Sequence, residues 1–216
     1  MRLDLHVHTN RSPDAVISPA EIVRRPLPGG LDGLAITDHN TIQGALEVKA
    51  AAPFLVIVGE EIASTEGEII GLFLREAIPK GLSPEETIAA IREQQGLVYV
   101  PHPLDRLRRE ALGRRTLERV IGQVDALEVF NARNLVQQDN ELADHLALTY
   151  GLARGAGSDA HCAYEIGRGY VVVEPFDGPA SFLEALRRGQ IGGAATTPLV
   201  HILTTLTRLY RRLSTK

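Results

Sequence analysis

The chain has 216 residues, of which 44% are hydrophobic and 23% are charged, and its formal net charge is −4. This composition is typical of one globular domain, and so small a net charge argues neither for nor against a nucleic-acid partner. No run of about 18 apolar residues occurs, and the polar first residues do not resemble a signal peptide. A single cysteine, Cys162, excludes an internal disulfide framework. We therefore expect a cytoplasmic protein with no membrane span.

Short apolar runs rich in Val and Ile alternate with helical segments along the chain. The expected strands span residues 3–8, 33–37, 54–59, 69–74, 97–101, 126–131, 152–157 and 170–174. The expected helices begin at Ser18 and Ser83, each the N-cap of a Ser-Pro-x-Glu sequence, and span residues 134–150 and 179–188. Repeated alternation of strand and helix predicts an α/β fold of parallel βα units, and the number of strands favours a closed barrel.

Six of these apolar runs end in a histidine, a carboxylate or an amide. His6 and His8 point to one face of the first strand, because strand side chains alternate with a period of two. The other five runs end in Asp38-His39, Glu60-Glu61, His102, Asn131-Ala132-Arg133 and Asp159-Ala160-His161. In a parallel barrel the carboxyl ends of the strands meet at one rim, where active sites are built. We therefore expect these side chains to form one site.

The residue types in this set indicate a metal centre. Imidazole and carboxylate without thiolate favour Zn, Mn or Fe. Five histidines and at least two carboxylates exceed the four ligands of one tetrahedral ion, so the set predicts two or three divalent ions. Each motif alone has another explanation: His6 and His8 as solvated strand residues, Asp38 as a helix cap, His102 as part of a rigid turn. Their convergence on one rim favours the metal centre.

The same motifs carry a resemblance to a known family. They are Asp4-Leu5-His6-Val7-His8-Thr9, Thr37-Asp38-His39, Gly59-Glu60-Glu61-Ile62, Pro101-His102-Pro103 and Gly157-Ser158-Asp159-Ala160-His161. In order and spacing, over residues 1–175, the chain resembles the PHP (polymerase and histidinol phosphatase) family. The resemblance implies a distorted (β/α)7 TIM-like barrel, a metal site at the C-terminal ends of the strands, and metal-dependent phosphoesterase activity.

The resemblance also implies a set of metal ligands, with Glu61 as the bridge between ions. The implied ligands are His6, His8, Asp14, His39, Glu61, His102, Asp159 and His161. Asp14 stands where some members have a histidine. Asn131 stands where trinuclear members often have another histidine, which favours two ions and a weaker third. Glu60 and Glu61 face opposite sides of their strand, and only the Gly-x-Glu spacing of the family selects Glu61.

A phosphate substrate also needs cationic side chains. Arg133 is the leading candidate, because its guanidinium matches phosphate bidentately. Arg11, Arg168 and Asn131 are further candidates for substrate binding. The leaving group is expected to be protonated either by metal-bound water or by a nearby acid, Asp14 or Asp38, while hydroxide activated by the metal ions attacks phosphorus.

The expected reaction is hydrolysis of a phosphomonoester, either a small-molecule phosphate or a nucleotide. Three alternatives stay open at this point. A phosphodiesterase or exonuclease would act on nucleotides or short oligonucleotides, although no basic-aromatic stacking patch is evident. An amidohydrolase-type metal hydrolase often bridges its metals with a modified lysine at a strand end, but Lys49, Lys80 and Lys216 lie elsewhere. A non-catalytic binding module is the third alternative.

The last 20 residues are expected to form an element separate from the barrel. We expect a barrel domain over residues 1–196 and an amphipathic basic helix over residues 197–216, docked on the barrel. Its apolar stripe comprises Leu199, Leu203, Leu206, Tyr210 and Leu213, opposite Arg208, Arg211, Arg212 and Lys216. The remaining histidines, His145 and His201, lie outside the strand ends and are expected to be structural.

Overall fold

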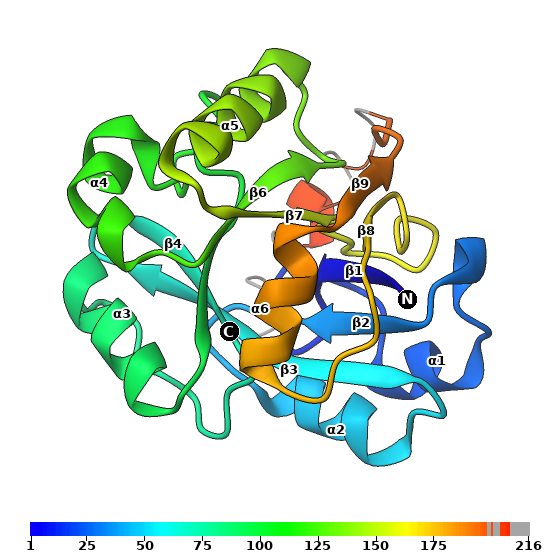
Figure 1. The fold of residues 1–216 in the computed structure, drawn as a ribbon. Coiled ribbons are helices and arrows are strands. Elements are labelled where there is room, and N and C mark those ends of the chain that lie inside the picture. Colours follow the sequence, from blue (N-terminus) through cyan, green and yellow to red (C-terminus); the bar gives the residue numbers. More distant parts are fainter. Residues whose placement is uncertain (198–199, 201–203, 208–216) are drawn as a thin grey trace.

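The computed structural model describes residues 1–197, 200 and 204–207, which form a mixed α/β fold (Figure 1). The strands are β1 (Arg2–Val7), β2 (Gly33–Ile36), β3 (Leu55–Ser64), β4 (Gly67–Leu72), β5 (Leu97–Val100), β6 (Ala126–Asn131), β7 (Ala153–Gly157), β8 (Gly169–Val172) and β9 (Gln190–Gly193). The helices are α1 (Pro19–Arg24), α2 (Gln43–Ala51), α3 (Pro84–Glu93), α4 (Gly113–Val120), α5 (Gln137–Tyr150) and α6 (Pro179–Arg187), with short 3-10 turns η1 (Pro28–Gly30) and η2 (Ile121–Gln123).

The strands form one nearly closed sheet in the order β7-β6-β5-β4-β3-β2-β1-β8-β9. The segment that follows β7 returns to β1, where Val7 and Ala160 form a parallel bridge and the His8 N–H donates to the Ala160 carbonyl at 2.9 Å. The buried Asp4 carboxylate strengthens this closure by accepting hydrogen bonds from the Ser158 N–H and the Gly167 N–H. The expected barrel is thus confirmed as a distorted, TIM-like one.

The sheet is not the all-parallel one that the sequence predicts. β1, β2 and β3 run parallel, as do β5, β6 and β7, but β4 is antiparallel to both β3 and β5. Only Thr65 and Glu66 connect β3 to β4, and two residues can form a hairpin turn but not the crossover that parallel strands need. β8 is also antiparallel to both of its neighbours, β1 and β9. Of these strands, β9 is the one that the sequence does not predict.

The residues that the sequence predicts to begin and end helices do so in the structure at Ser83 and Gly151. Ser83 begins α3 with a complete capping box, in which its hydroxyl accepts from the Glu86 N–H and the Glu86 carboxylate accepts from the Ser83 N–H. Gly151 ends α5 in the left-handed conformation, with φ 65°, which its missing side chain allows. The helices α2 and α4 have no such caps and were not predicted.

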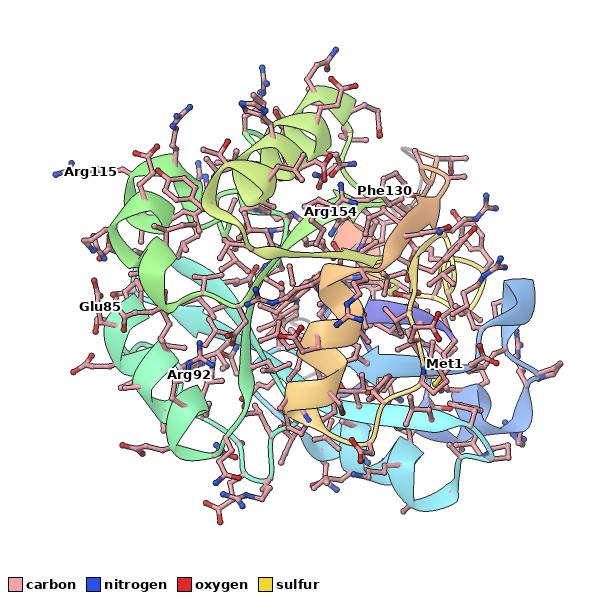
Figure 2. All side chains as sticks on the ribbon, viewed as in Figure 1. Met1, Glu85, Arg92, Arg115, Phe130 and Arg154 are labelled. Carbon is pink, nitrogen blue, oxygen red and sulfur yellow. The ribbon has the colours of Figure 1, made fainter. Side chains whose placement is uncertain are left out.

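Helices α1 to α5 lie around the outside of the sheet, as Figure 1 shows. Each contributes apolar side chains to a core shared with the strands, among them Ile22, Val48, Ile91, Leu117 and Leu146. Their outer faces are charged, and Figure 2 shows Glu85 and Arg115 pointing away from the sheet, whereas Arg92 pairs with Asp125 just before β6 at 2.8 Å.

α6 crosses the strands near the middle of the view in Figure 1. Phe182 and Leu186 of α6 join a second apolar cluster with Leu5 of β1 and Tyr99 of β5. This packing covers the sheet without closing the rim at the ends of the parallel strands.

The division into a barrel and a C-terminal helix stays a prediction. Residues 204–207 are helical, and Leu206 is exposed. His201 and most of the expected stripe and its basic face lie outside the described residues: Leu199, Leu203, Tyr210, Leu213, Arg208, Arg211, Arg212 and Lys216. In the described part of the chain, no helix has the length and apolarity needed to cross a bilayer.

Candidate metal centre

The structure brings all eight expected ligands together at one rim of the sheet. His6 lies in β1 and Glu61 in β3, while the others lie in the segments that follow β1, β2, β5 and β7: His8 and Asp14, His39, His102, and Asp159 and His161. Seven of the eight are fully or almost fully buried, and His39 alone of the eight is partly exposed, at 17% of its side chain.

Glu61 is the centre of the arrangement. Its Oε2 lies 3.2 Å from His39 Nδ1, 3.3 Å from His8 Nε2 and 3.4 Å from His6 Nε2. Its Oε1 lies 3.0 Å from His102 Nε2. A single carboxylate thus faces four imidazoles, as expected for a ligand shared between metal ions.

Asp159 and Asp14 complete the cluster on either side. Asp159 Oδ1 lies 3.3 Å from His8 Nε2 and 3.5 Å from His161 Nδ1. Asp14 lies between two imidazoles, with Oδ1 3.4 Å from His161 Nε2 and Oδ2 3.7 Å from His39 Nε2. Several triplets of these residues place ligand atoms within 4.8 Å of one another, including His8, His39 and His161.

The donor atoms fit divalent metal ions. Glu61 Oε2 and Asp159 Oδ1 are buried, and neither has a hydrogen-bond partner among the described residues, although imidazole nitrogens surround both. The Nε2 atoms of His6 and His8 face each other at 3.1 Å. Buried oxygens without partners are costly unless a cation binds them, and nitrogen and carboxylate ligands suit Zn, Mn or Fe.

The same crowding shifts the pKa values of the cluster. Burial disfavours the charged form of His6, but the carboxylates of Glu61, Glu128 and Asp159 outweigh it and raise the pKa. Burial, together with the neighbouring His161, lowers the pKa of His8 to about 3. For Glu61, burial is outweighed by His6, His39 and His102, which hold its pKa well below the usual range. Metal binding requires neutral His6 and ionised Glu61, so a bound ion would replace the proton that the carboxylates favour on His6.

Outer residues fix the orientation of the imidazoles. Glu128, a carboxylate within β6, lies 3.1 Å from His6 Nδ1 and also accepts from the His102 N–H at 2.8 Å. Ser12 Oγ lies 3.1 Å from His8 Nδ1 and donates to Asp38 Oδ1 at 2.8 Å. Such partners fix the tautomer and ring plane of metal-binding histidines.

Two residues of the cluster have a strained backbone. His102 and Asp159 have φ values of 28° and 53°, in the left-handed region that non-glycine residues rarely adopt. In both cases the turn aims the side chain at the rim directly after a strand. Strain of this kind concentrates at functional sites, where the surrounding structure holds it in place.

A cavity of about 320 Å³ opens beside the cluster. Asp14, His39 and His161 form part of its wall, and Arg133 contributes a cation. The Arg133 guanidinium lies 2.5 Å from His161 Nδ1 and donates to Thr204 Oγ1 at 2.6 Å. The cavity therefore combines the expected ligands with the expected phosphate-binding arginine.

The structure does not bring the other expected substrate contacts to this cavity. Arg11 is at the surface, paired with Glu47, and Arg168 is exposed above the Tyr164 ring. Asn131 is buried and donates to Glu128 Oε2 at 2.8 Å.

Asp38, expected as a proton donor, is fully buried outside the cavity lining. Its two oxygens accept hydrogen bonds from Thr9 and Ser12. These contacts make Asp38 a support for the loop after β1, because both oxygens are engaged away from the cavity.

Three charged residues at the site were missed by the sequence analysis. Glu128 of β6 is a carboxylate inside an apolar strand run, a signal that was available in the sequence, whereas Glu68 of β4 stands just before its apolar run. Arg108 lies in the loop after β5 and pairs with Asp159 Oδ2 at 2.8 Å. It is one of several arginines in that loop, so no local pattern distinguishes it.

Comparisons with known proteins match this chain to one family. The model of the PHP domain matches residues 4–104, and that of the PHP-associated region matches residues 137–191. Two uncharacterized proteins of Methanocaldococcus jannaschii are relatives: one is 47% identical over 61% of this chain and 82% of its own length, the other 36% identical over 87% and 79%. A 5'-3' exoribonuclease of Haemophilus influenzae is 36% identical over 44% of this chain and 37% of its own length.

Solved structures with low sequence identity share the fold. A two-domain protein from Bacteroides vulgatus, described as containing a predicted PHP-like metal-dependent phosphoesterase, superimposes with a TM-score of 0.70 at 18% identity, over 96% of this chain and 69% of that one. An amidohydrolase from Chromobacterium violaceum, solved with bound sulfate and no metal, gives a TM-score of 0.64 at 19% identity, over 87% and 97% of the two chains. With its motifs, fold and relatives in agreement, this chain belongs to the PHP family.

Proposed function

We propose that this protein is a metal-dependent phosphoesterase that hydrolyses a phosphomonoester of a small molecule or nucleotide. The observation that carries the proposal is the convergence of five imidazoles and three carboxylates in one cluster, of which Asp14, His39 and His161 reach the wall of a cavity that Arg133 also lines. The cofactors are two or three divalent ions, Mn, Zn or Fe. Bound ions of this kind activate water near neutral pH and withdraw charge from phosphoryl oxygens.

Different residues of the site bind the metal ions and the substrate phosphate. His6, His8, Glu61 and Asp159 hold one ion, Asp14, His39 and His161 a second, and His102 with Glu61 the remaining one. Arg133 binds the phosphoryl oxygens bidentately and neutralises the charge that develops on them. Asp14 lines the cavity and Asp38 does not, but His161 and His39 outweigh burial and hold the pKa of Asp14 well below its usual range, so Asp14 would bind metal as a carboxylate rather than protonate the leaving group.

A substrate panel tests this proposal. Purified protein is stripped with a chelator, reloaded with Mn, Zn or Fe, and assayed on phosphomonoesters, phosphodiesters, amides and aminopurines. We expect metal-dependent release of inorganic phosphate from monoesters. Hydrolysis or deamination of the amide or aminopurine substrates without phosphatase activity would assign the site to an amidohydrolase. Absence of stoichiometric metal would indicate a non-catalytic module.

A second candidate is phosphodiester hydrolysis from the end of a nucleotide or short oligonucleotide. The similarity to the H. influenzae 5'-3' exoribonuclease favours it, although the match spans little more than a third of that protein. A further cavity of about 390 Å³ next to the site shares Asp105 and Arg108 with the first and adds Arg106 and Arg114 to its lining. Cleavage of 5'-phosphorylated dinucleotides at a higher kcat/KM than monoesters would favour this candidate.

A further inference from the structure

Glu165 is a buried carboxylate in the segment that follows β7, close in sequence to His161. Only 1% of its surface is exposed, and it does not line the cavity beside the metal cluster. Its Oε2 accepts hydrogen bonds from the backbone N–H groups of His161 at 2.9 Å and Cys162 at 3.1 Å. Glu165 therefore fixes the backbone of the turn that carries one of the expected metal ligands.

The other carboxylate oxygen of Glu165 faces Arg133. Its Oε1 lies 3.4 Å from Arg133 Nε, and both side chains are buried. Within the described part of the chain, this oxygen accepts no hydrogen bond, so Arg133 is the cation that it faces. A buried carboxylate is costly unless a cation pairs with it. The pair thus joins the loop after β6, which carries Arg133, to the turn after β7.

The contact with Glu165 is made at one edge of the Arg133 guanidinium. The two terminal nitrogens lie beside residues of the cavity wall: one is 2.5 Å from His161 Nδ1, and the other donates to Thr204 Oγ1 at 2.6 Å. A guanidinium held at Nε keeps its plane fixed and presents both terminal nitrogens on the same side. Two parallel N–H donors of this kind match two oxygens of a phosphoryl group.

We propose that Glu165 is a positioning residue, which holds Arg133 in the orientation that binds the substrate phosphate and joins it to the turn of His161. The inference rests on the phosphoesterase function proposed above. Loss of the Glu165 charge removes no metal ligand and no group that touches substrate. Its effect therefore falls on the affinity for phosphate and leaves the number of bound metal ions unchanged.

The competing role for Glu165 is to stabilise the turn after β7 and nothing more. Glu165→Gln separates the two roles, because the amide oxygen can still accept from the two backbone N–H groups while the amide NH2 faces the Arg133 Nε–H, donor against donor. Glu165→Asp keeps the charge but shortens the side chain. A role confined to the turn predicts that the Gln variant, which has the shape of glutamate, is closer to wild type. Positioning by charge predicts that the Asp variant is closer.

Asp125, just before β6, offers a matched control. It is almost as buried, with 11% of its side chain exposed, and it too combines a backbone contact with an ion pair. Its Oδ2 accepts from the Val98 N–H at 2.7 Å and lies 2.8 Å from the Arg92 guanidinium. Neither Asp125 nor Arg92 lines the cavity that holds Arg133. Asp125→Asn therefore breaks a comparable ion pair away from the site.

The experiment measures the Kd of inorganic phosphate for the Mn-loaded protein by calorimetric titration. We expect this Kd to rise by about 10–100-fold in Glu165→Gln and by less in Glu165→Asp, with the number of bound Mn ions unchanged. Asp125→Asn should stay within about twofold of wild type. A Kd for Glu165→Gln within about twofold of wild type would overturn the inference, as would a larger loss in Glu165→Asp than in Glu165→Gln.

A double-mutant cycle with Arg133→Ala shows whether Glu165 acts through Arg133. In the Arg133→Ala background, Glu165→Gln should change the Kd of phosphate by less than about twofold, whereas additive losses would contradict the inference. Circular dichroism confirms that each variant is folded. Nuclear magnetic resonance of the Arg133 Nε–H in wild type tests the contact without a variant: slow exchange with solvent is expected, and rapid exchange would contradict it.

Hydrolysis of a phosphomonoester is read separately from phosphate binding. A protein that loses phosphate affinity in Glu165→Gln but hydrolyses no phosphoester keeps this inference and loses the proposed function. A protein that hydrolyses phosphomonoesters with the same Kd for phosphate in wild type and Glu165→Gln keeps the proposed function and loses this inference.

Discussion

At the scale of single residues, Glu60 and Glu61 show how the face of a strand decides the chemistry of a side chain. Glu61 faces four imidazoles, which hold its pKa low. Glu60 faces the other way, where it is buried and accepts from the Ile78 N–H at 2.8 Å. Burial raises the pKa of Glu60 to about 7. Adjacent carboxylates of one strand therefore have opposite charge preferences.

A pH-dependent stability follows for Glu60. Its pKa is higher in the folded than in the unfolded chain, so its contribution to stability is complete below about pH 4.5 and is lost as the pH rises through about 7. The loss is at most about 3 kcal/mol. In Glu60→Gln the side chain stays neutral. We expect urea denaturation to show Glu60→Gln gaining stability over wild type between pH 5 and pH 8. Equal differences at both pH values would contradict this assignment.

Arg133 carries a second residue-scale prediction. It is buried at the cavity, whereas Arg168 is exposed above Tyr164. Loss of a donor to a developing negative charge typically costs about 10²–10³ in kcat. We expect a fall of this size in the kcat/KM of a phosphomonoester for Arg133→Ala, partial recovery in Arg133→Lys, and a change of less than about twofold in Arg168→Ala. Equal effects of Arg133→Ala and Arg168→Ala on kcat/KM would show that Arg133 does not bind the substrate phosphate.

At the scale of elements, the close approach of β7 to β1 and β6 positions His6. A Cβ at Gly157 would lie 2.3 Å from His6 Cβ and 2.6 Å from Glu128 Oε1, so only glycine fits there. Gly122, in η2, has no atom within 4 Å of such a Cβ and makes a matched control.

We expect Gly157→Ala to lower the free energy of unfolding by about 1–3 kcal/mol, as overpacking does. It should also weaken metal binding, because His6 must move. Gly122→Ala should stay within about 0.5 kcal/mol of wild type. The measurements are chemical denaturation of the stripped protein and metal titration. Wild-type metal affinity in a stably folded Gly157→Ala would refute the link between this contact and the metal centre.

The hairpin of β3 and β4 marks the limit of what the sequence could predict. The expected ligands could be found because each follows an apolar run, and strand ends share a rim when the strands are parallel. Glu68 precedes its run, so a parallel β4 would place it at the opposite rim. Only the antiparallel pairing, which depends on a two-residue turn, brings it to the site. Glu128 and Arg108 depend in the same way on long-range packing against His6 and Asp159.

At the scale of the whole molecule, the metal centre is expected to stabilise the fold. It draws ligands from the segments of β1, β2, β3, β5 and β7, and four buried carboxylates lie within it: Asp14, Glu61, Glu68 and Asp159. Bound ions at 100 times their Kd stabilise a protein by about 2.7 kcal/mol per site. We expect chelation to lower the Tm by about 5–10 °C for each tightly held ion lost. An unchanged Tm after complete stripping would indicate that the ions do not join these segments.

The account as a whole depends on the claim that this cluster binds metal ions and that the bound ions hydrolyse a phosphoester. The most direct measurement compares wild type with the double variant His102→Ala and Asp159→Ala, both stripped of metal and reloaded with Mn, on an aryl phosphate. The account predicts that turnover returns in wild type in proportion to the Mn bound, and that the folded double variant gives no turnover above background. Retained turnover in the double variant would contradict it.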